Sequence, residues 1–535
     1  MSKKIKITPA SVIIGVIGAV LISASSFYTV LKFGALPWPT VMVTLISIMA
    51  LNFFKKTDSR EITVTHTIMS AGSMVAGGVA FTMPGYLILG GKLENINKTL
   101  LFVTILLGSV LGCVLSFIFR KKMIEEEKLE FPIGEAAYNL VNSDNTKKDG
   151  LFVGLGVLFS TVVSILRDIN FTKGKSPIIP TLISTKNGFL SFYVSPLLVG
   201  IGYILGFLNT FIWFLGGALV HFIAQPLAIS KNIKDFDLMK NSFGMGIVVG
   251  IGFGVIVKLI FSKFKKEKKS TSIFSKKLFT YFLITVLLIT FIYKLPIILA
   301  FVLLVICILC TIIAGYSTGK TGVNPMEIYA IITILIISFL GKLKFLNFAF
   351  STNFSTLLLF FLACIVAVAC GLAGDILNDF KSGYKTKTDP KEQFLGELIG
   401  AIVSSVVITW LFFVFFNIYK NIGPKENSEL IVLQASIVAS IINGIPFIQF
   451  FFTGLLIGFA LYMLNFPVLT FGIGIYVPFY LTLPVFLGGL LNLIFGKIST
   501  KFSQKFMMFS NGLMSGEAII GVIISLIAYY FLLFR

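Results

Sequence analysis

The sequence has little charge and few of the residues that build catalytic or metal sites. Charged residues make up 13% of its 535 positions, and it contains 2 histidines and 5 cysteines. A soluble chain of this length would be about one quarter charged and would divide into several globular domains. The composition therefore excludes an ordinary soluble protein. It also offers little material for a disulfide framework or a metal site.

Missing motifs argue against a membrane enzyme. The sequence has no complete G-x-x-x-x-G-K-S/T phosphate-binding loop, no aspartate-rich prenyl-diphosphate motif and no His pair spaced for zinc or haem. A glycine-rich string from Gly244 to Gly254 lies inside an apolar run, where a dinucleotide fold cannot form, and predicts helix packing. Cys307 and Cys310 form a C-x-x-C without a nearby His or acidic ligand, so we interpret all five cysteines as core residues.

Hydrophobic residues dominate the chain. They account for 56% of it and include 56 Phe against 3 Trp. A helix needs about 20 apolar residues to cross a bilayer, and the sequence offers more than a dozen such stretches. Lipid cannot satisfy backbone polar groups, so these stretches must be helical. The sequence predicts an all-α polytopic membrane protein.

The cations are clustered between the apolar runs. The net charge of +21 comes from 44 Lys and Arg against 23 Asp and Glu. Basic clusters at the N-terminus, 55–60, 120–122, 263–277 and 381–391 all fall on one side when spans are counted forward, which the positive-inside rule makes cytoplasmic. We expect a plasma-membrane protein with a cytoplasmic N-terminus whose first helix, at about 10–31, is not a signal peptide. Nucleic acid is not an expected partner.

The apolar runs give a count of 15 to 17 spans. Twelve are expected near 10–31, 36–54, 65–90, 99–119, 150–166, 189–208, 210–229, 243–262, 277–294, 296–315, 326–341 and 355–376, with later spans near 393–418, 429–463, 466–493 and 518–533. Asn443, Gly444 and Pro446 interrupt one of the later spans, and Pro478 and Pro484 interrupt another, so we expect broken or re-entrant helices there.

A basic segment at the chain midpoint suggests two repeated halves. About eight spans precede residues 263–277, and an even number gives both halves the same starting orientation. We therefore expect an N-terminal transmembrane half at 1–262, a basic cytoplasmic linker at 263–277 and a C-terminal transmembrane half at 278–535.

Small and polar residues gather within one early apolar stretch. The run THTIMSAGSMVAGGVAFTMPG, ending at Gly85, contains Thr65, His66, Thr67 and Ser70. Glycine and serine at this density let helices approach closely, which predicts a packing helix. The alternative is a helix that lines a substrate cavity.

Two further segments interrupt the apolar pattern. Residues 129–141 include FPIGEA with Glu135, and they form either an interfacial helix or a re-entrant segment buried in protein. Residues 315–325, GYSTGKTGVNP, are either an extracellular loop or unwound backbone that contacts substrate.

Carboxylates stand out in two late segments. Residues 371–400 form the expected cytoplasmic hairpin, with Asp375 and Asp379 one turn apart at the end of one helix and Glu397 just inside the next. In NGLMSGEAIIGV, Glu517 stands at the expected mouth of the last helix, where the helix dipole favours a negative charge. Ionisable residues inside a membrane are nevertheless functional candidates, because burying one costs about 2.5 kcal/mol or more.

Five of these segments, in this order, together resemble the oligopeptide transporter (OPT) family, which includes the yellow-stripe-like metal-chelate carriers. The resemblance runs from about Glu61 to Val522 through THTIMSAG, FPIGEA, the Gly-rich segment at 315–325, GDILNDFKSGY and GLMSGEA. It implies 16 spans and a secondary active transporter that imports small peptides or peptide-like metal chelates, with proton symport. It also makes a homodimer plausible.

The candidate residues divide by role. We assign substrate contacts to Thr65, His66, Thr67, Ser70 and the break from Asn443 to Pro446. Burial raises the pKa of a carboxyl group toward the physiological range, so a buried acid can load a proton on one side and release it on the other. The proton-coupling or gating candidates are Glu135, Asp375, Asp379, Glu397 and Glu517, with Glu135 or Glu517 as the favoured proton carrier.

Other classes of function remain open. The nearest alternative is a sodium-coupled carrier of another small organic solute, and a channel or a membrane enzyme is more distant. No cofactor or resident metal is expected.

Overall fold

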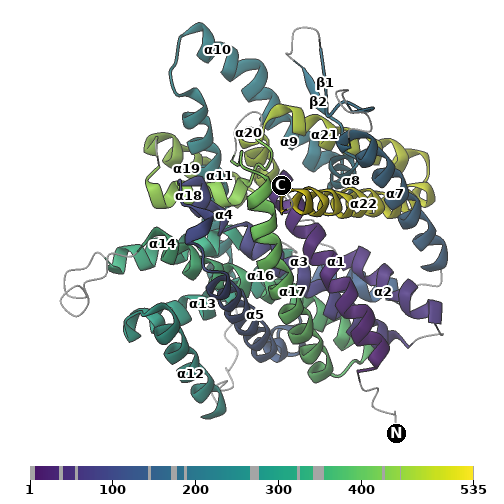
Figure 1. Ribbon diagram of the computed structural model, residues 1–535, viewed down its shortest axis with the longest axis vertical. Coiled ribbons are helices and arrows are strands. Elements are labelled where there is room, and N and C mark those ends of the chain that lie inside the picture. Colours follow the sequence, from purple (N-terminus) through teal and green to yellow (C-terminus); the bar gives the residue numbers. More distant parts are fainter. Residues whose placement is uncertain are drawn as a thin grey trace.

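The chain folds almost entirely into helices. The computed structural model describes residues 7–34, 40–54, 58–141, 146–169, 177–185, 190–264, 276–321, 324, 326–341, 355–423, 428–445 and 447–533. Within these ranges, the strands are one antiparallel hairpin, β1 (Leu182–Ser184) with β2 (Ser191–Tyr193) (Figure 1).

The elements follow one another with short connections. The first half contains α1 (Pro9–Phe33), α2 (Thr40–Phe54), α3 (Ser59–Ala80), α4 (Pro84–Ile88), η1 (Leu93–Asn95), α5 (Lys98–Arg120), η2 (Lys121–Glu126), α6 (Pro132–Val141), α7 (Thr146–Asp168), α8 (Pro196–Leu205), α9 (Phe207–Ala218), η3 (Leu219–Ala224), α10 (Gln225–Ser230) and α11 (Phe236–Phe264). The second half contains α12 (Lys276–Tyr293), α13 (Ile297–Thr321), α14 (Met326–Gly341), α16 (Thr356–Thr386), α17 (Pro390–Ile418), α18 (Leu433–Asn443), α19 (Ile448–Met463), α20 (Val468–Tyr476), α21 (Phe479–Ile498) and α22 (Thr500–Leu533).

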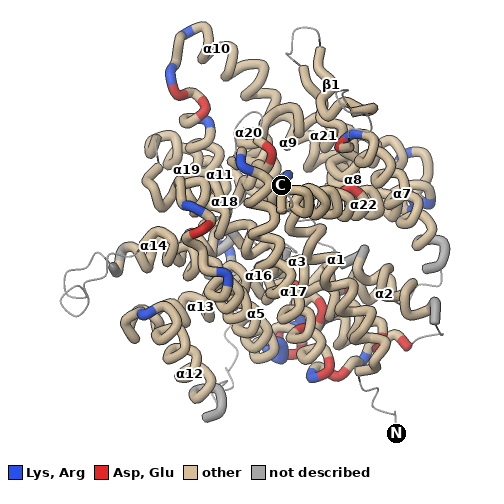
Figure 2. Tube along the Cα trace, in the orientation of Figure 1, with Lys and Arg blue, Asp and Glu red and all other residues tan. Residues whose placement is uncertain are grey.

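The helices have the length and composition of membrane spans. In the described part of the chain, ten are long and apolar enough to cross a bilayer, and six shorter apolar helices of 10–17 residues accompany them. The two sets match the expected total of about 16. Charged residues gather along one edge and around α10, and long uncharged stretches separate them (Figure 2). The prediction of an all-α polytopic membrane protein is confirmed.

Three helices form the centre of the molecule. The helix α3 packs against both α16 and α17, and α5 packs on α16 from the other side (Figure 1). Small residues permit this approach. A Cβ atom added to Gly78 would lie 2.6 Å from Val368 Cα of α16, and one added to Gly400 would lie 2.1 Å from Ile68 O. The glycines of α3 and α17 therefore set how closely these helices pack.

The two predicted halves interleave in space. Helix α3 of the first half packs on α16 and α17 of the second, α7 packs on α22, and α11 packs on α19. A Cβ atom at Gly246 of α11 would lie 2.1 Å from Phe451 O of α19, which confirms helix packing for that glycine-rich string. Most of the basic linker, residues 265–275, lies outside the described residues. The division into repeated halves stays a prediction.

Several expected boundaries are confirmed and others move. The chain breaks at Gly444, where φ is +89°, between α18 and α19, and again at Pro478 between α20 and α21. Pro484, in contrast, lies inside α21. Leu190 to Tyr193 precede α8 as part of the β-hairpin, so the expected span from residue 189 begins late. The last helix begins at Thr500 instead of about residue 518, because polar residues of its first turns continue the helix.

The glycine-rich segment at 315–325 differs from both interpretations. The helix α13 continues to Thr321, so Gly315 and Gly319 are helical and unwound backbone is wrong there. The Phe131 amide donates to Gly319 O (2.9 Å), and Tyr316 Oη donates to Glu127 Oε1 (2.5 Å). This end of α13 thus lies beside the segment that follows α5, which the positive-inside count made cytoplasmic, so the extracellular loop is also wrong. Gly-Lys-Thr here closes a helix, whereas a phosphate-binding loop precedes one.

Candidate functional site

The charged segment at 371–400 is mostly helical and buried. We expected Asp375 and Asp379 at the end of a helix, but α16 continues to Thr386 and ends at Lys387, which takes the left-handed conformation (φ +59°). The next helix begins immediately, with Asp389 accepting a hydrogen bond from the Lys391 amide as N-cap. The hairpin is real, but its turn is short, and the two aspartates lie inside the bundle.

Asp379 is the centre of a polar cluster between α3 and α16. Its carboxylate accepts a hydrogen bond from Ser70 Oγ (2.6 Å), and its other oxygen lies 3.5 Å from His66 Nε2. All three side chains are excluded from solvent. His66 and Ser70 are four residues apart on α3 and therefore share one face. Two predicted substrate residues and one predicted coupling residue thus meet.

Asp375 and Glu397 bring two more carboxyl groups to the same place. They interact electrostatically with Asp379, and each is fully buried. Among the described residues, neither carboxyl group has a hydrogen-bond partner, and the same holds for Asp379 Oδ1 and both nitrogens of His66. A buried polar group without a partner costs about 1–3 kcal/mol, and more if it is charged. We call His66, Ser70, Asp375, Asp379 and Glu397 the buried acidic cluster.

Neighbouring polar residues tie the cluster to α17. Gln393 Nε2 donates to the backbone oxygen of Asp379 (2.8 Å) and lies 3.4 Å from Thr67 Oγ1. Thr65 Oγ1 donates to Glu61 O within α3 (2.9 Å). Asn378 Oδ1, between the two aspartates, accepts from the Gly134 amide of α6 (3.1 Å). In the described part of the chain, no three His, Cys, Asp or Glu side chains are placed to hold a metal ion.

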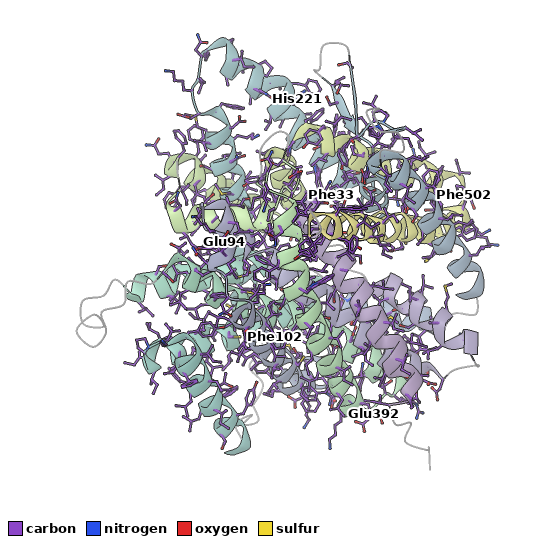
Figure 3. All side chains as sticks on the ribbon, viewed as in Figure 1. Phe33, Glu94, Phe102, His221, Glu392 and Phe502 are labelled. Atoms are coloured by element: carbon purple, nitrogen blue, oxygen red, sulfur yellow. The ribbon has the colours of Figure 1, made fainter. Side chains whose placement is uncertain are left out.

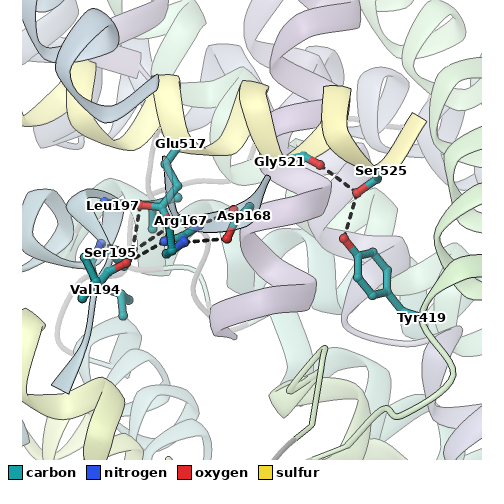
Figure 4. Close-up of polar contacts among 10 residues, drawn as sticks. Arg167, Asp168, Val194, Ser195, Leu197, Tyr419, Glu517, Gly521 and Ser525 are labelled. Atoms are coloured by element: carbon teal, nitrogen blue, oxygen red, sulfur yellow. Dashed lines mark hydrogen bonds and ion pairs between the residues drawn. The ribbon is translucent and has the colours of Figure 1, made fainter. Parts of the chain in front are cut away.

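Glu517 has very different surroundings (Figure 4). It lies in the middle of α22, not at its start, so the helix dipole does not explain it. Arg167 Nη1 of α7 donates to its Oε1 (2.7 Å), the Leu197 amide donates to its Oε2 (2.8 Å), and Ser195 Oγ lies 2.9 Å from Oε2. Arg167 also binds Asp168 and the backbone oxygen of Val194. We call Arg167, Ser195 and Glu517 the α7–α22 ion-pair site.

Glu135 lies at the surface end of α16. Its carboxylate is 30% exposed and pairs with Lys385, and Lys381 Nζ is 3.8 Å from its other oxygen. Because the preceding Gly134 reaches Asn378 deep in α16, the helix α6 begins against the protein interior and ends outside it. This contact favours the re-entrant interpretation over a purely interfacial helix.

A cavity of about 530 Å³ lies away from the acidic cluster, between α9, η3, α11, α18 and α20. Its walls include His221, Asn241, Ser242, Ser440 and Tyr476. His221, in the π-helical η3 (Figure 3), stacks on Phe479 with ring centroids 4.6 Å apart. Asn241 Oδ1 and Ser242 Oγ are buried without a partner in the described part of the chain. These atoms can bind a ligand in the cavity.

The predicted substrate residues do not line this cavity. Thr65, His66, Thr67 and Ser70 belong to or adjoin the acidic cluster, and Asn443 is exposed at the end of α18. Pro446 lies outside the described residues. The helix before the break does reach the cavity, through Ser436 and Ser440.

Sequence reasoning missed the cavity residues for a physical reason. Asn241 and Ser242 precede a glycine-rich run that predicts packing, and the two cavity walls are more than 200 residues apart in sequence. One available signal was His221, one of only 2 histidines. Its π-helical turn, a conformation frequent at functional sites, is not visible in the sequence.

Known proteins resemble this chain over nearly its whole length. The profile of the family described as OPT oligopeptide transporter protein matches residues 6–245 and 264–528. A Haemophilus influenzae protein that carries the name "Putative oligopeptide transporter" is 26% identical over 593 aligned positions, which cover 94% of this chain and 92% of that relative. Both matches include the acidic cluster and the cavity.

Proposed function

Because this chain belongs to the OPT oligopeptide transporter family, we propose that it imports small peptides, or peptide-like metal chelates, by proton-coupled alternating access across the plasma membrane. The family and the helical architecture make the chain a multi-pass membrane transporter and not an enzyme. The cargo, the coupling ion and the membrane are our proposal. The name of the Haemophilus influenzae relative favours peptides over chelates.

Proton coupling rests on one observation, the buried acidic cluster. Asp375, Asp379 and Glu397 place three carboxyl groups together inside the bundle, with several oxygens lacking donors among the described residues. Three negative charges in one apolar space repel each other, and adding a proton removes part of that repulsion. A conformational change that opens the cluster to one side would release the proton there. His66, within 3.5 Å of Asp379, supplies a second group that can exchange it.

The cavity supports a small organic cargo. Its volume of about 530 Å³ is within the usual range for small-molecule sites. Hydroxyl, amide and aromatic side chains line it together with backbone, and Asp237 and Lys240 bring one charge of each sign. Such a lining suits a peptide backbone with two charged ends. Thr65, Thr67 and Ser70 then act on the coupling side of the mechanism rather than as direct substrate contacts.

Two of the predicted carboxylates suit gating better than proton transfer. Glu135 connects α6 to α16 through Lys385 at a partly exposed position, so its pairing can change as that end opens. Glu517 is held by Arg167, Ser195 and the Leu197 amide, and a carboxylate with this many donors stays charged. We assign it the fixed connection between α7 and α22.

Uptake by proteoliposomes tests the proposal. We expect labelled trialanine to accumulate under an inward proton gradient and not under a sodium gradient at equal pH. Accumulation that needs sodium and ignores the proton gradient would instead establish the sodium-coupled alternative. Trans-stimulated exchange of labelled for unlabelled trialanine would support a carrier, whereas flux without exchange would indicate a channel.

A ligand screen tests the cargo class separately. Thermal unfolding of the purified protein would be measured with di- to hexapeptides, glutathione, and ferric and nickel chelates. Stabilisation by peptides alone supports peptide import, and stabilisation by chelates alone supports the chelate branch. The mass of the detergent-solubilised protein in the same preparation would show whether it is the proposed homodimer.

A further inference from the structure

A buried lysine lies where five elements meet. Lys32 is in the last turn of α1, next to Phe33, which lies in the middle of the molecule (Figure 3). The tyrosines Tyr28, Tyr193 and Tyr419 are all close enough to interact with its charge. Within the described residues, the Lys32 ammonium group has no carboxylate partner, and its printed contact is with the Tyr28 ring, 5.9 Å from the ring centroid. An ionisable group inside a membrane protein without a partner is a candidate binding residue.

The nearby arginine is already occupied. Arg167 lies over the Tyr193 ring, with its Cζ 5.5 Å from the ring centroid, but its nitrogens bind Glu517, Asp168 and Val194 O. Its charge is therefore balanced locally, whereas that of Lys32 is not. The interaction between these two cations is repulsive, so an anion beside Lys32 would relieve it.

Hydroxyl groups complete the surroundings of Lys32. Tyr28 and Tyr193 are 2% and 6% exposed, and neither hydroxyl makes a hydrogen bond to another described residue. The Tyr419 hydroxyl pairs with Ser525 Oγ at 2.9 Å (Figure 4). One ammonium group and two unused hydroxyl donors match a group that only accepts hydrogen bonds and carries one negative charge. A carboxylate has these properties.

Packing holds the tyrosines in place. Tyr28 and Lys32 are four residues apart and share one face of α1. A Cβ atom at Gly521 of α22 would lie 2.4 Å from Tyr28 Cζ, so only glycine leaves room for the Tyr28 ring there. The Tyr28 ring also packs on Phe415, which stacks on Tyr419. The donor groups are thus positioned before any ligand arrives.

The Lys32 site adjoins the cavity. Tyr193 lies two residues after Ser191 on β2, which lines the cavity, and its ring lies 6.2 Å from that of Tyr480, another lining residue. A ligand in the cavity could therefore extend one end past Tyr480 toward Lys32. Nothing in the sequence motifs points to this residue.

We propose that Lys32, with the hydroxyl groups of Tyr28 and Tyr193, binds the C-terminal carboxylate of the transported peptide. This inference rests on the proposed peptide transport and names the part of the cargo that the site recognises. It predicts that a free C-terminus is required for tight binding.

Binding of trialanine and of trialanine amide to the full-length purified protein tests the proposal. We expect the amide to need about a tenfold or higher concentration for equal thermal stabilisation, because it cannot form the charge-assisted hydrogen bond. In Lys32→Gln the preference for the free acid should disappear. Lys32→Arg should retain part of it, and Tyr28→Phe, which removes only a hydroxyl group, should reduce it.

Lys98→Gln is the matched control, because Lys98 also lies over an aromatic ring, that of Phe413 at 5.4 Å, far along the chain from this site. It should keep the full preference. If Lys32→Gln does not fold, Tyr28→Phe and Lys32→Arg carry the test. Equal binding of acid and amide to the unmodified protein would overturn the carboxylate site while leaving peptide transport intact. Stabilisation by chloride alone, with no acid preference, would also overturn it, and failure of both peptides to bind would overturn peptide transport as well.

Discussion

Glu517 and Asp379 are both almost completely excluded from solvent, at 0% and 1% exposure, yet their surroundings differ. Glu517 accepts hydrogen bonds from Arg167, Ser195 and the Leu197 amide. Asp379 has one hydroxyl donor, Ser70, and two further carboxyl groups close by. Burial alone therefore does not say what a membrane carboxylate does.

The difference lies in the number of donors. A buried carboxylate with a cation and several hydrogen bonds is stable in its charged form and links the elements around it. A buried carboxyl group that lacks donors and faces like charges is more stable when one proton is present. The first arrangement suits a permanent connection between helices, and the second suits an exchangeable proton.

Removing the cation from the α7–α22 ion-pair site should have the largest effect. Arg167→Met leaves Glu517 as a buried charge without its main partner, which costs about 3–5 kcal/mol. We expect a large fall in the thermal unfolding temperature of the purified protein and poor expression. The measurement is thermal unfolding in detergent against the unmodified chain.

A double variant sharpens this prediction. Arg167→Met combined with Glu517→Gln removes both charges, and it should unfold at a higher temperature than Arg167→Met alone, because no uncompensated charge remains. Equal or greater damage in the double variant would mean that the ion pair is not the source of the stability.

The pattern of apolar runs was enough to predict the fold class, because each span must satisfy its backbone internally. The lengths of the helices were harder to predict. The polar residues of α16 after Gly374 suggested a loop, but packing against α3, α6 and α17 keeps them helical. The same happened at α22, where Thr500 begins a helix that the apolar pattern placed later.

For the site, the sequence identified residue types but not their partners. His66, Ser70, Asp375, Asp379 and Glu397 were all candidates, and the structure brings them together across more than 300 residues of sequence. Arg167 escaped notice because an arginine at the end of an apolar run usually marks a membrane surface. Lys32 was overlooked for the same reason.

Neutralising the buried acidic cluster should affect transport more than stability. Asp379→Asn keeps an acceptor for Ser70 but cannot exchange a proton. We expect proton-gradient-driven trialanine uptake to fall by about tenfold or more, with exchange at equal pH retained and with unfolding temperature unchanged or higher, since a costly buried charge is removed. Proteoliposome uptake and thermal unfolding on the same preparation measure both quantities.

Asp389→Asn is the matched control, because Asp389 belongs to the same hairpin but is an exposed N-cap. Asparagine also caps helices well, so this variant should behave like the unmodified protein in both assays. Undiminished gradient-driven uptake by Asp379→Asn would remove the cluster from the coupling mechanism and break the contrast with Glu517.

The smallest effect should come from Glu135, the partly exposed carboxylate that pairs with Lys385. Exposed ion pairs contribute about 0–1 kcal/mol, so Glu135→Gln should lower stability by less than about 1 kcal/mol, and high salt should erase the difference. As a gating residue, Glu135 should alter the rate of uptake at low salt without changing its dependence on the proton gradient. Thermal unfolding and uptake at two salt concentrations measure these effects. If Glu135→Gln uncoupled uptake as fully as Asp379→Asn, a solvated carboxylate would carry the proton, and the number of donors around a buried acid would no longer separate coupling from structural roles.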